Sequence, residues 1–157
     1  MRLLITLLTA SLLAASPVMA RDIKATTPHV GGSANADLLR LDGNTLFAFA
    51  KADLTPAGKQ AIDAALKKAP TLLITPLKIT GHTDDQGSSK ANYDLSFKRA
   101  EAVRKYLQAK GHHLAIDVAG RGETEPLVKC NAKLPKAELV KCLQPNRRVD
   151  VEVVYGS

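Results

Sequence analysis

The feature that most restricts the fold of this chain is a long helical pattern between two short strand-like runs. The pattern predicts a helix from about Ser88 to Lys110, ended by Gly111. Strands are expected on either side, in "TLLITPLKITG" and "LAIDVAGRGE". The buried stripe of the helix is expected at Leu95, Ala100, Val103 and Leu107. A helix placed between two strands in this way packs on the face of a sheet.

Another strand and another helix are expected ahead of this unit. The run "NTLFAFAKADL" alternates around Phe47 and Phe49 and predicts the first strand. Thr55 is a suitable N-cap for the helix that follows, with Pro56 at its first position. Pro70 ends this helix because proline cannot continue a helical hydrogen-bond ladder.

The last strand is expected in "RRVDVEVVY", where Val149, Val151 and Val153 alternate with other residues, as in a half-buried strand. Pro76 is placed at the start of the second strand because it cannot donate to a ladder. The predicted fold class is α+β, in the order β-α-β-α-β-β. We expect a two-layer sandwich with the helices on one face of a mixed sheet.

The first twenty residues differ from the rest of the chain. One arginine, an apolar run and a small-residue ending at Ala20 are typical of a cleaved secretory signal peptide. An uncleaved membrane anchor is the alternative, although the run is short for a span of about 20 residues. Residues 21–40 lack periodicity and predict a flexible segment, so the domain is expected at residues 41–157.

The composition is basic, with 22 Lys and Arg, 15 Asp and Glu, and a formal net charge of +7. This balance favours anionic polymers or surfaces as partners, although a soluble basic surface has the same composition. Nucleic acid is not expected as a partner. An exported protein rarely meets it, and three Phe and three Tyr without any Trp offer few surfaces for stacking bases.

The chain has two cysteines, Cys130 and Cys142. In an exported protein an even pair predicts a disulfide. It would close a loop of about 13 residues and stabilise the fold by about 3 kcal/mol in the chain-entropy account. Reactive thiols are the alternative, but no catalytic partner motif surrounds either residue.

An acid-rich loop, Thr83 to Gly87, stands directly before the long helix. Because an α-helix turns about 100° per residue, Asn92 and Arg99 lie about 20° apart on one side, next to the loop that holds Asp84. A ligand with a carboxylate and an ammonium group would satisfy Arg99 and Asp84 together. From spacing alone, a direct ion pair between Asp84 and Arg99 explains the pattern equally well.

The sequence contains no nucleophile elbow, zinc-protease pair or P-loop. His82 lies beside two aspartates, but a metal site needs three or four converging ligands, so we interpret His82 as the polar edge of the second strand. His112 and His113 are interpreted as solvated residues after the helix. We therefore expect no catalysis, no metal and no cofactor.

Four segments carry a family resemblance: "TDDQG", "NYDLSFKRAEAVRKYL", "GRGETEP" and "NRRVDVEV". Together they resemble the C-terminal domain of outer-membrane protein A. That family also includes the peptidoglycan-associated lipoprotein and the wall-binding domains of flagellar stators. The likeness runs from about Asn44 to Val154, and the cysteine spacing resembles that of enterobacterial members, which carry this disulfide.

The resemblance implies non-covalent binding of peptidoglycan in the periplasm of a Gram-negative cell. In the family, the aspartate and arginine at the positions of Asp84 and Arg99 hold the diaminopimelate of the stem peptide. Asn92 and Thr83 match two further residues beside the ligand, and Arg147 is a weaker match. The resemblance also implies association with the outer membrane, or with an envelope-complex protein as a second partner.

The first strand departs from the family pattern. Relatives often carry Asp or Asn at the positions of Ala48 and Ala50, where the polar groups contribute to the pocket or its rim. Their loss puts the affinity, or the preferred stem peptide, in question. A module that binds another periplasmic protein on the same fold, with weak or lost peptidoglycan binding, is therefore the alternative function.

Overall fold

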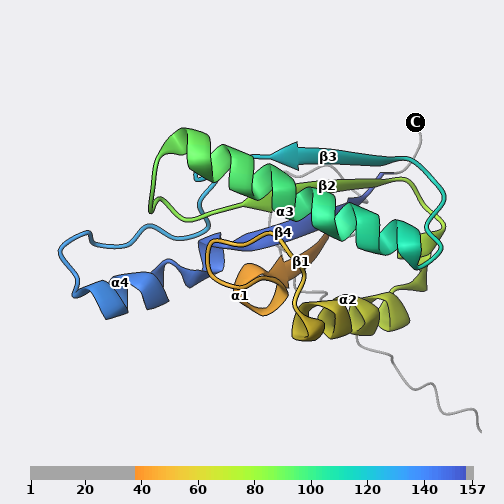
Figure 1. Ribbon diagram of the computed structural model, residues 1–157, viewed down its shortest axis with the longest axis horizontal. Coiled ribbons are helices and arrows are strands. Elements are labelled where there is room, and N and C mark those ends of the chain that lie inside the picture. The colour runs from red at the N-terminus through yellow and green to blue at the C-terminus, as the bar shows by residue number, and fades with distance from the viewer. Residues whose placement is uncertain (1–37, 155–157) are drawn as a thin grey trace, which may run out of the picture. The chain divides into compact units, whose positions relative to one another are not determined.

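The centre of the molecule is a four-stranded mixed sheet with the spatial order β1-β4-β2-β3 (Figure 1). The structure is a computed structural model that describes residues 38–154. The strands are β1 (Leu38–Asp42), β2 (Leu77–His82), β3 (Ile116–Gly120) and β4 (Arg148–Val153). β2 and β3 are parallel, whereas β4 is antiparallel to both β1 and β2. The signal peptide expected at residues 1–20 lies outside the described residues.

The two long helices cover one face of the sheet (Figure 1). They are α2 (Pro56–Lys68) and α3 (Ser89–Ala109). The short helices α1 (Gly43–Leu46) and α4 (Lys136–Cys142) lie outside this layer, and 3₁₀ turns form at Pro70–Leu73 and Gln144–Asn146. The expected α+β class, with helices on one face of a mixed sheet, is confirmed.

The hydrophobic core lies between these helices and the sheet. Its central residues are Ile62 and Leu66 from α2, Ala100, Val103 and Leu107 from α3, Leu77 and Ile79 from β2, and Val149, Val151 and Val153 from β4. Thr55 caps α2, because its hydroxyl accepts a hydrogen bond from Gly58 N at 2.9 Å. The capping signals and apolar periodicities therefore predict these elements correctly.

The predicted position of the first strand, in residues 44–54, is wrong. Residues 38–42 form β1 and pair with β4, although 38–40 were expected to be flexible. Asp42 then caps α1 and ends the strand, because its carboxylate accepts from Asn44 N at 3.1 Å. Phe47 makes only an isolated bridge to Leu54, and Phe49 is 95% exposed. The alternation of the two phenylalanines therefore does not mark a strand.

β4 is more buried than a half-buried strand, because polar residues on its other face are paired. Arg148 Nε lies 3.1 Å from Asp150 Oδ2, and His82 Nε2 lies 3.5 Å from the same oxygen. His82 is 2% exposed on the inner strand β2, which corrects its assignment to a polar edge. Burial first and the positive charge of Arg148 second lower the pKa of His82, so the neutral ring is favoured.

His112 is also buried, at 1% exposure, although it was expected to be solvated. Its Nε2 lies 2.8 Å from the Thr75 carbonyl and can donate a hydrogen bond to it, which ties the end of α3 to the segment before β2. His113 is exposed, as expected. Among the helices of residues 38–154, none has the length and apolar character needed to cross a membrane.

Candidate functional site

The residues expected at the site line one pocket of about 600 Å³. Thr83 and Asp84 come from the loop after β2, Asn92 and Arg99 from α3, and Arg147 from the residue before β4. The remaining lining comes from residues 43–44 and 47–50, Gln86, Leu95, and Lys136 and Val140 of α4. The structure therefore brings all five expected ligand-binding residues to one place.

The position of α3 depends on direct backbone contact with β2. A Cβ atom on Gly81 would lie 2.0 Å from the carbonyl oxygen of Ser96, so only glycine allows this approach. Gly87, with φ of 120°, turns the chain into α3, and Ser88 caps the helix through Ala91 N at 3.3 Å. The start of α3 is thus fixed beside the Thr83–Gly87 loop.

Arg99 is 5% exposed, and no carboxylate among residues 38–154 pairs with it within 4.0 Å. Its Nε donates to the Lys51 carbonyl at 2.9 Å, and its guanidinium lies 5.1 Å from the centre of the Phe47 ring. Burial first and Arg147 second lower the pKa of Arg99, whereas Asp84 raises it. A direct Asp84–Arg99 ion pair, one of the two readings of the spacing, is therefore not formed.

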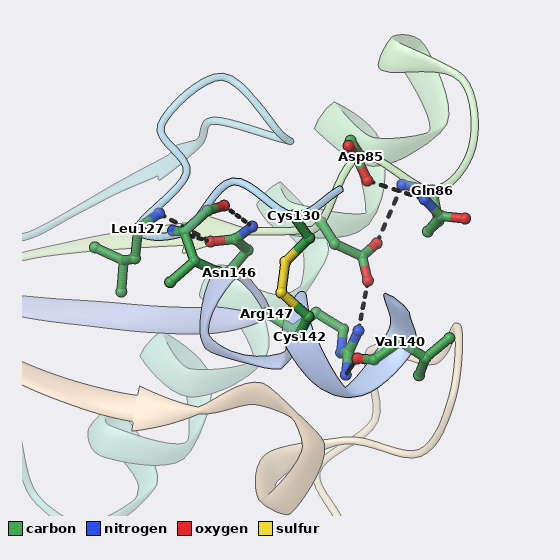
Figure 2. Close-up of a disulfide and its surroundings, with 10 residues drawn as sticks. Asp85, Gln86, Leu127, Cys130, Val140, Cys142, Asn146 and Arg147 are labelled. Atoms are coloured by element: carbon green, nitrogen blue, oxygen red, sulfur yellow. Dashed lines mark hydrogen bonds and ion pairs between the residues drawn. A yellow bond between two sulfur atoms is a disulfide. The ribbon is translucent and has the colours of Figure 1, made fainter. Parts of the chain in front are cut away.

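Arg147 is the partner of Asp84, and its place in the site is more central than the sequence suggested. Its Nη1 lies 2.5 Å from Asp84 Oδ2, and its Nε donates to Asn44 Oδ1 at 2.8 Å. Its Nη2 donates to the Val140 carbonyl at 3.1 Å (Figure 2). One guanidinium thus joins the β2 loop, α1 and α4. The second oxygen of Asp84 accepts from Gln86 N at 3.3 Å.

Two polar atoms of the pocket residues have no hydrogen-bond partner. Thr83 Oγ1 and Asn92 Nδ2 are both buried, on side chains that are 4% and 5% exposed. The Asn92 amide lies near the Glu123 carboxyl. The pKa of this carboxyl is lowered by Ser89 first and to a smaller degree by Asn92, so the interaction between Asn92 and Glu123 is weak. An unsatisfied buried polar atom costs about 1–3 kcal/mol. Both atoms are covered by protein, so a ligand meets them only if the two side chains turn toward the pocket.

The expected disulfide between Cys130 and Cys142 is formed, with 6.1 Å between the two Cα atoms (Figure 2). The loop that it closes contains α4, which the sequence analysis missed. Pro135, directly before the helix, was the available signal. Asn146, which follows α4, holds the chain just before Cys130. Its Oδ1 accepts hydrogen bonds from Leu127 N at 2.8 Å and Val128 N at 3.0 Å.

The rim formed by Ala48, Phe49 and Ala50 is apolar and exposed. Ala50 has a φ of 55°, in the left-handed region that alanine rarely occupies. Phe47, Phe49 and Val140 were missed as pocket residues because only the tertiary fold brings them together. Among residues 38–154, no group of three or more His, Cys, Asp or Glu side chains is arranged to hold a metal ion.

The sequence of this chain is similar to part of outer membrane protein A from several bacteria. The chain is 35% identical over 141 residues to outer membrane protein A of Yersinia pseudotuberculosis, covering 85% of this chain and 39% of that protein. Outer membrane protein A of Atlantibacter hermannii is 39% identical over 118 residues, covering 72% and 49%. The chain thus spans less than half the length of these two relatives.

Several solved structures share the fold. The cell wall anchor of the T6SS from Pseudomonas aeruginosa has a TM-score of 0.59 at 25% identity, covering 77% of this chain and 82% of that one. A MotB-like protein from Desulfovibrio vulgaris has a TM-score of 0.61 at 26% identity, covering 78% and 75%. The peptidoglycan-associated lipoprotein of Burkholderia pseudomallei has a TM-score of 0.50 at 27% identity, covering 68% and 86%.

A model of the OmpA family matches residues 46–138. This range is more than half of the chain, and it contains the β2 loop, all of α3 and the pocket residue Lys136 at the start of α4. The chain therefore belongs to the OmpA family.

Proposed function

We propose that this protein binds peptidoglycan non-covalently through the diaminopimelate of the stem peptide, without catalysing a reaction. The observation that carries the proposal is the placement of Asp84 and Arg99 in one pocket without an ion pair between them. Two similar structures are named as a cell wall anchor and a peptidoglycan-associated lipoprotein, which supports the same class of ligand.

Each end of a zwitterionic centre has a partner in the pocket. The planar guanidinium of Arg99 binds the carboxylate, because it presents paired donors to two oxygens. The carboxylate of Asp84 receives the ammonium group while Arg147 keeps it oriented. Asn92 and Thr83 line the same pocket, and their amide and hydroxyl groups donate the remaining hydrogen bonds once the side chains turn toward the ligand.

The expected binding is weak and reversible. Two charge-assisted contacts contribute about 1.5–3 kcal/mol each, so their sum corresponds to a dissociation constant of about a millimolar for one fragment. The cell wall presents the same fragment at high density, and rapid rebinding retains a protein that binds each copy weakly. We propose a reversible attachment to the wall rather than a permanent one.

The domain organisation belongs to the same proposal. Residues 1–20 act as the cleaved signal peptide, and the binding domain starts near Leu38, where β1 begins. The protein then works in the periplasm, close to the outer membrane, with peptidoglycan as its partner. An outer-membrane or envelope-complex protein is the second partner that we propose.

Co-sedimentation with purified sacculi tests this function. Asp84→Ala and Arg99→Ala each remove one charge-assisted contact, so we expect the affinity to fall about tenfold or more. Arg104→Ala is the matched control, because Arg104 lies on the same helix but pairs with Glu101 away from the pocket. This variant should sediment as the wild type does.

Other results would contradict the proposal. Sedimentation that survives both Asp84→Ala and Arg99→Ala would favour a protein-interaction module, for which the apolar Ala48 and Ala50 rim is the supporting observation. Release of soluble muropeptides from the sacculi would show catalysis, which the proposal excludes.

A further inference from the structure

The charges that line the pocket are unbalanced. Three cations, Arg99, Lys136 and Arg147, face it together with one carboxylate, that of Asp84. Arg147 already pairs with Asp84, at 2.5 Å. A zwitterionic centre brings one positive and one negative charge, so its binding leaves the excess positive charge of the pocket unchanged.

Lys136 is the cation that the proposed function does not use. It lies in the first turn of α4, it is exposed, and no carboxylate of residues 38–154 lies within 4.0 Å of its ammonium group. Val140 lines the same pocket one turn later. Residues four apart share a face of a helix, so this face of α4 is the one directed at the pocket.

Covalent and hydrogen-bonded contacts hold this face in place. The disulfide fixes Cys142 at the end of α4, and Arg147 Nη2 donates to the carbonyl of Val140 (Figure 2). α4 itself contains no buried residue, so these attachments replace the missing core contacts. Lys136 is thereby kept at the pocket that Asp84 also lines, although it lies on an otherwise exposed segment.

We infer that Lys136 is a further ligand-binding residue, which selects stem peptides carrying a second carboxylate next to the diaminopimelate centre. The inference rests on the proposed function and names the class of peptide that the site prefers. Two groups have the required chemistry: the α-carboxylate of the neighbouring γ-linked glutamyl residue and the free carboxyl end of the peptide. Amidation of either group removes the charge that Lys136 would meet.

Calorimetric titration with synthetic tripeptides tests the inference. The probes are alanyl-γ-glutamyl-diaminopimelate, its glutamyl amide, its terminal amide and free diaminopimelate. Lys136→Gln should weaken the fully charged tripeptide about two- to fivefold, the range of an exposed ion pair. For the amide that lacks the responsible carboxylate, the variant should bind as the wild type does. Lys133→Gln is the control, because Lys133 lies in the same disulfide loop but not in the pocket lining.

The role of the disulfide is tested by the same titrations on the Cys130→Ser/Cys142→Ser protein. There, Lys136→Gln should have a smaller effect than in the oxidised protein. An equal effect in both backgrounds would overturn the positioning role. Equal affinities of Lys136→Gln and Lys133→Gln for all four probes would overturn the inference but leave the proposed function standing. A wild type that binds none of the probes would overturn both.

Discussion

The two walls of the pocket are built in different ways. The inner wall consists of Thr83, Asp84, Asn92, Leu95 and Arg99, and it rests on β2 and α3. The outer wall consists of residues 43–44 and 47–50 with Lys136 and Val140. Directly behind the inner wall, Ile79, Ala100 and Val103 are fully buried.

In the outer wall, α4 buries nothing, and Ala48, Phe49 and Ala50 are all exposed. Phe47 joins the outer wall to the hydrophobic core, but α4 contains no buried residue and is held by the disulfide and by Arg147 instead. We interpret this difference as two separate roles for the two walls. Rigid packing fixes the pair of charges that defines the ligand class, and the tethered segment is free to vary and adjust which member of the class is preferred.

The largest effect is expected from Gly81→Ala, which forces the inner wall apart. The new methyl group would meet the Ser96 carbonyl at 2.0 Å, so α3 must move, and we expect a loss of more than about 3 kcal/mol in unfolding free energy. Val140→Ala on the outer wall should cost less than about 0.5 kcal/mol, because Val140 is 42% exposed. Urea unfolding measures both, and equal costs would break the comparison.

Removal of the disulfide should have the next largest effect. The Cys130→Ser/Cys142→Ser protein is expected to lose about 3 kcal/mol, because a loop with a sequence separation of 12 is no longer closed in the unfolded chain. Hydrogen exchange should show protection lost first in α4 and kept longest in β2 and α3. Loss of protection throughout the domain at the same rate would mean that the outer wall is not a separate unit.

Arg147→Ala should cost about 2 kcal/mol, since it leaves the partly buried Asp84 carboxylate without its partner. The same change should also weaken ligand binding, because only the hydrogen bond from Gln86 N then orients Asp84. Arg147→Lys should restore the ion pair but not the bonds to Asn44 and Val140, and so recover only part of the stability. Full recovery of stability with lysine would show that the hydrogen bonds of Arg147 to Asn44 and Val140 contribute little to the unfolding free energy. Thermal unfolding alongside ligand titration separates the two effects.

A smaller effect, and a stabilising one, is expected at the rim. Ala50→Asn should stabilise the protein by about 0.5–1 kcal/mol, because asparagine tolerates the left-handed conformation at φ of 55° better than alanine does. Ala48→Asn is the control, since among the described non-glycine residues only Ala50 has a positive φ. Differential scanning calorimetry resolves such a change. Equal melting temperatures for the two variants would contradict the explanation by the left-handed backbone of Ala50.

Local sequence signals were sufficient for the inner wall. The periodicity of α3, its stop at Gly111 and the acid-rich loop before it are enough to predict that Asp84, Asn92 and Arg99 lie near one another. The diaminopimelate role of these residues stays a proposal, but their common location is a structural fact.

The outer wall could not be predicted in this way, because its contacts join distant parts of the sequence. Arg147 bonds to Asn44 across a separation of 103 residues and to Asp84 across 63. The burial of His82 was missed for a similar reason, since its partner Asp150 lies on another strand. Local polarity predicts exposure only when no distant residue is available to satisfy the polar group.

The position of β4 has a consequence for how the protein is made. The last strand of the domain lies between β1 and β2, so β1 has no neighbour in the sheet until residues 148–153 have been synthesised and inserted. A nascent chain that already contains Asp84 and Arg99 still lacks β4, which joins β1 to β2, and Arg147, which directly precedes β4. The ability to hold the wall should therefore appear late and abruptly, when the final segment leaves the ribosome or the export channel.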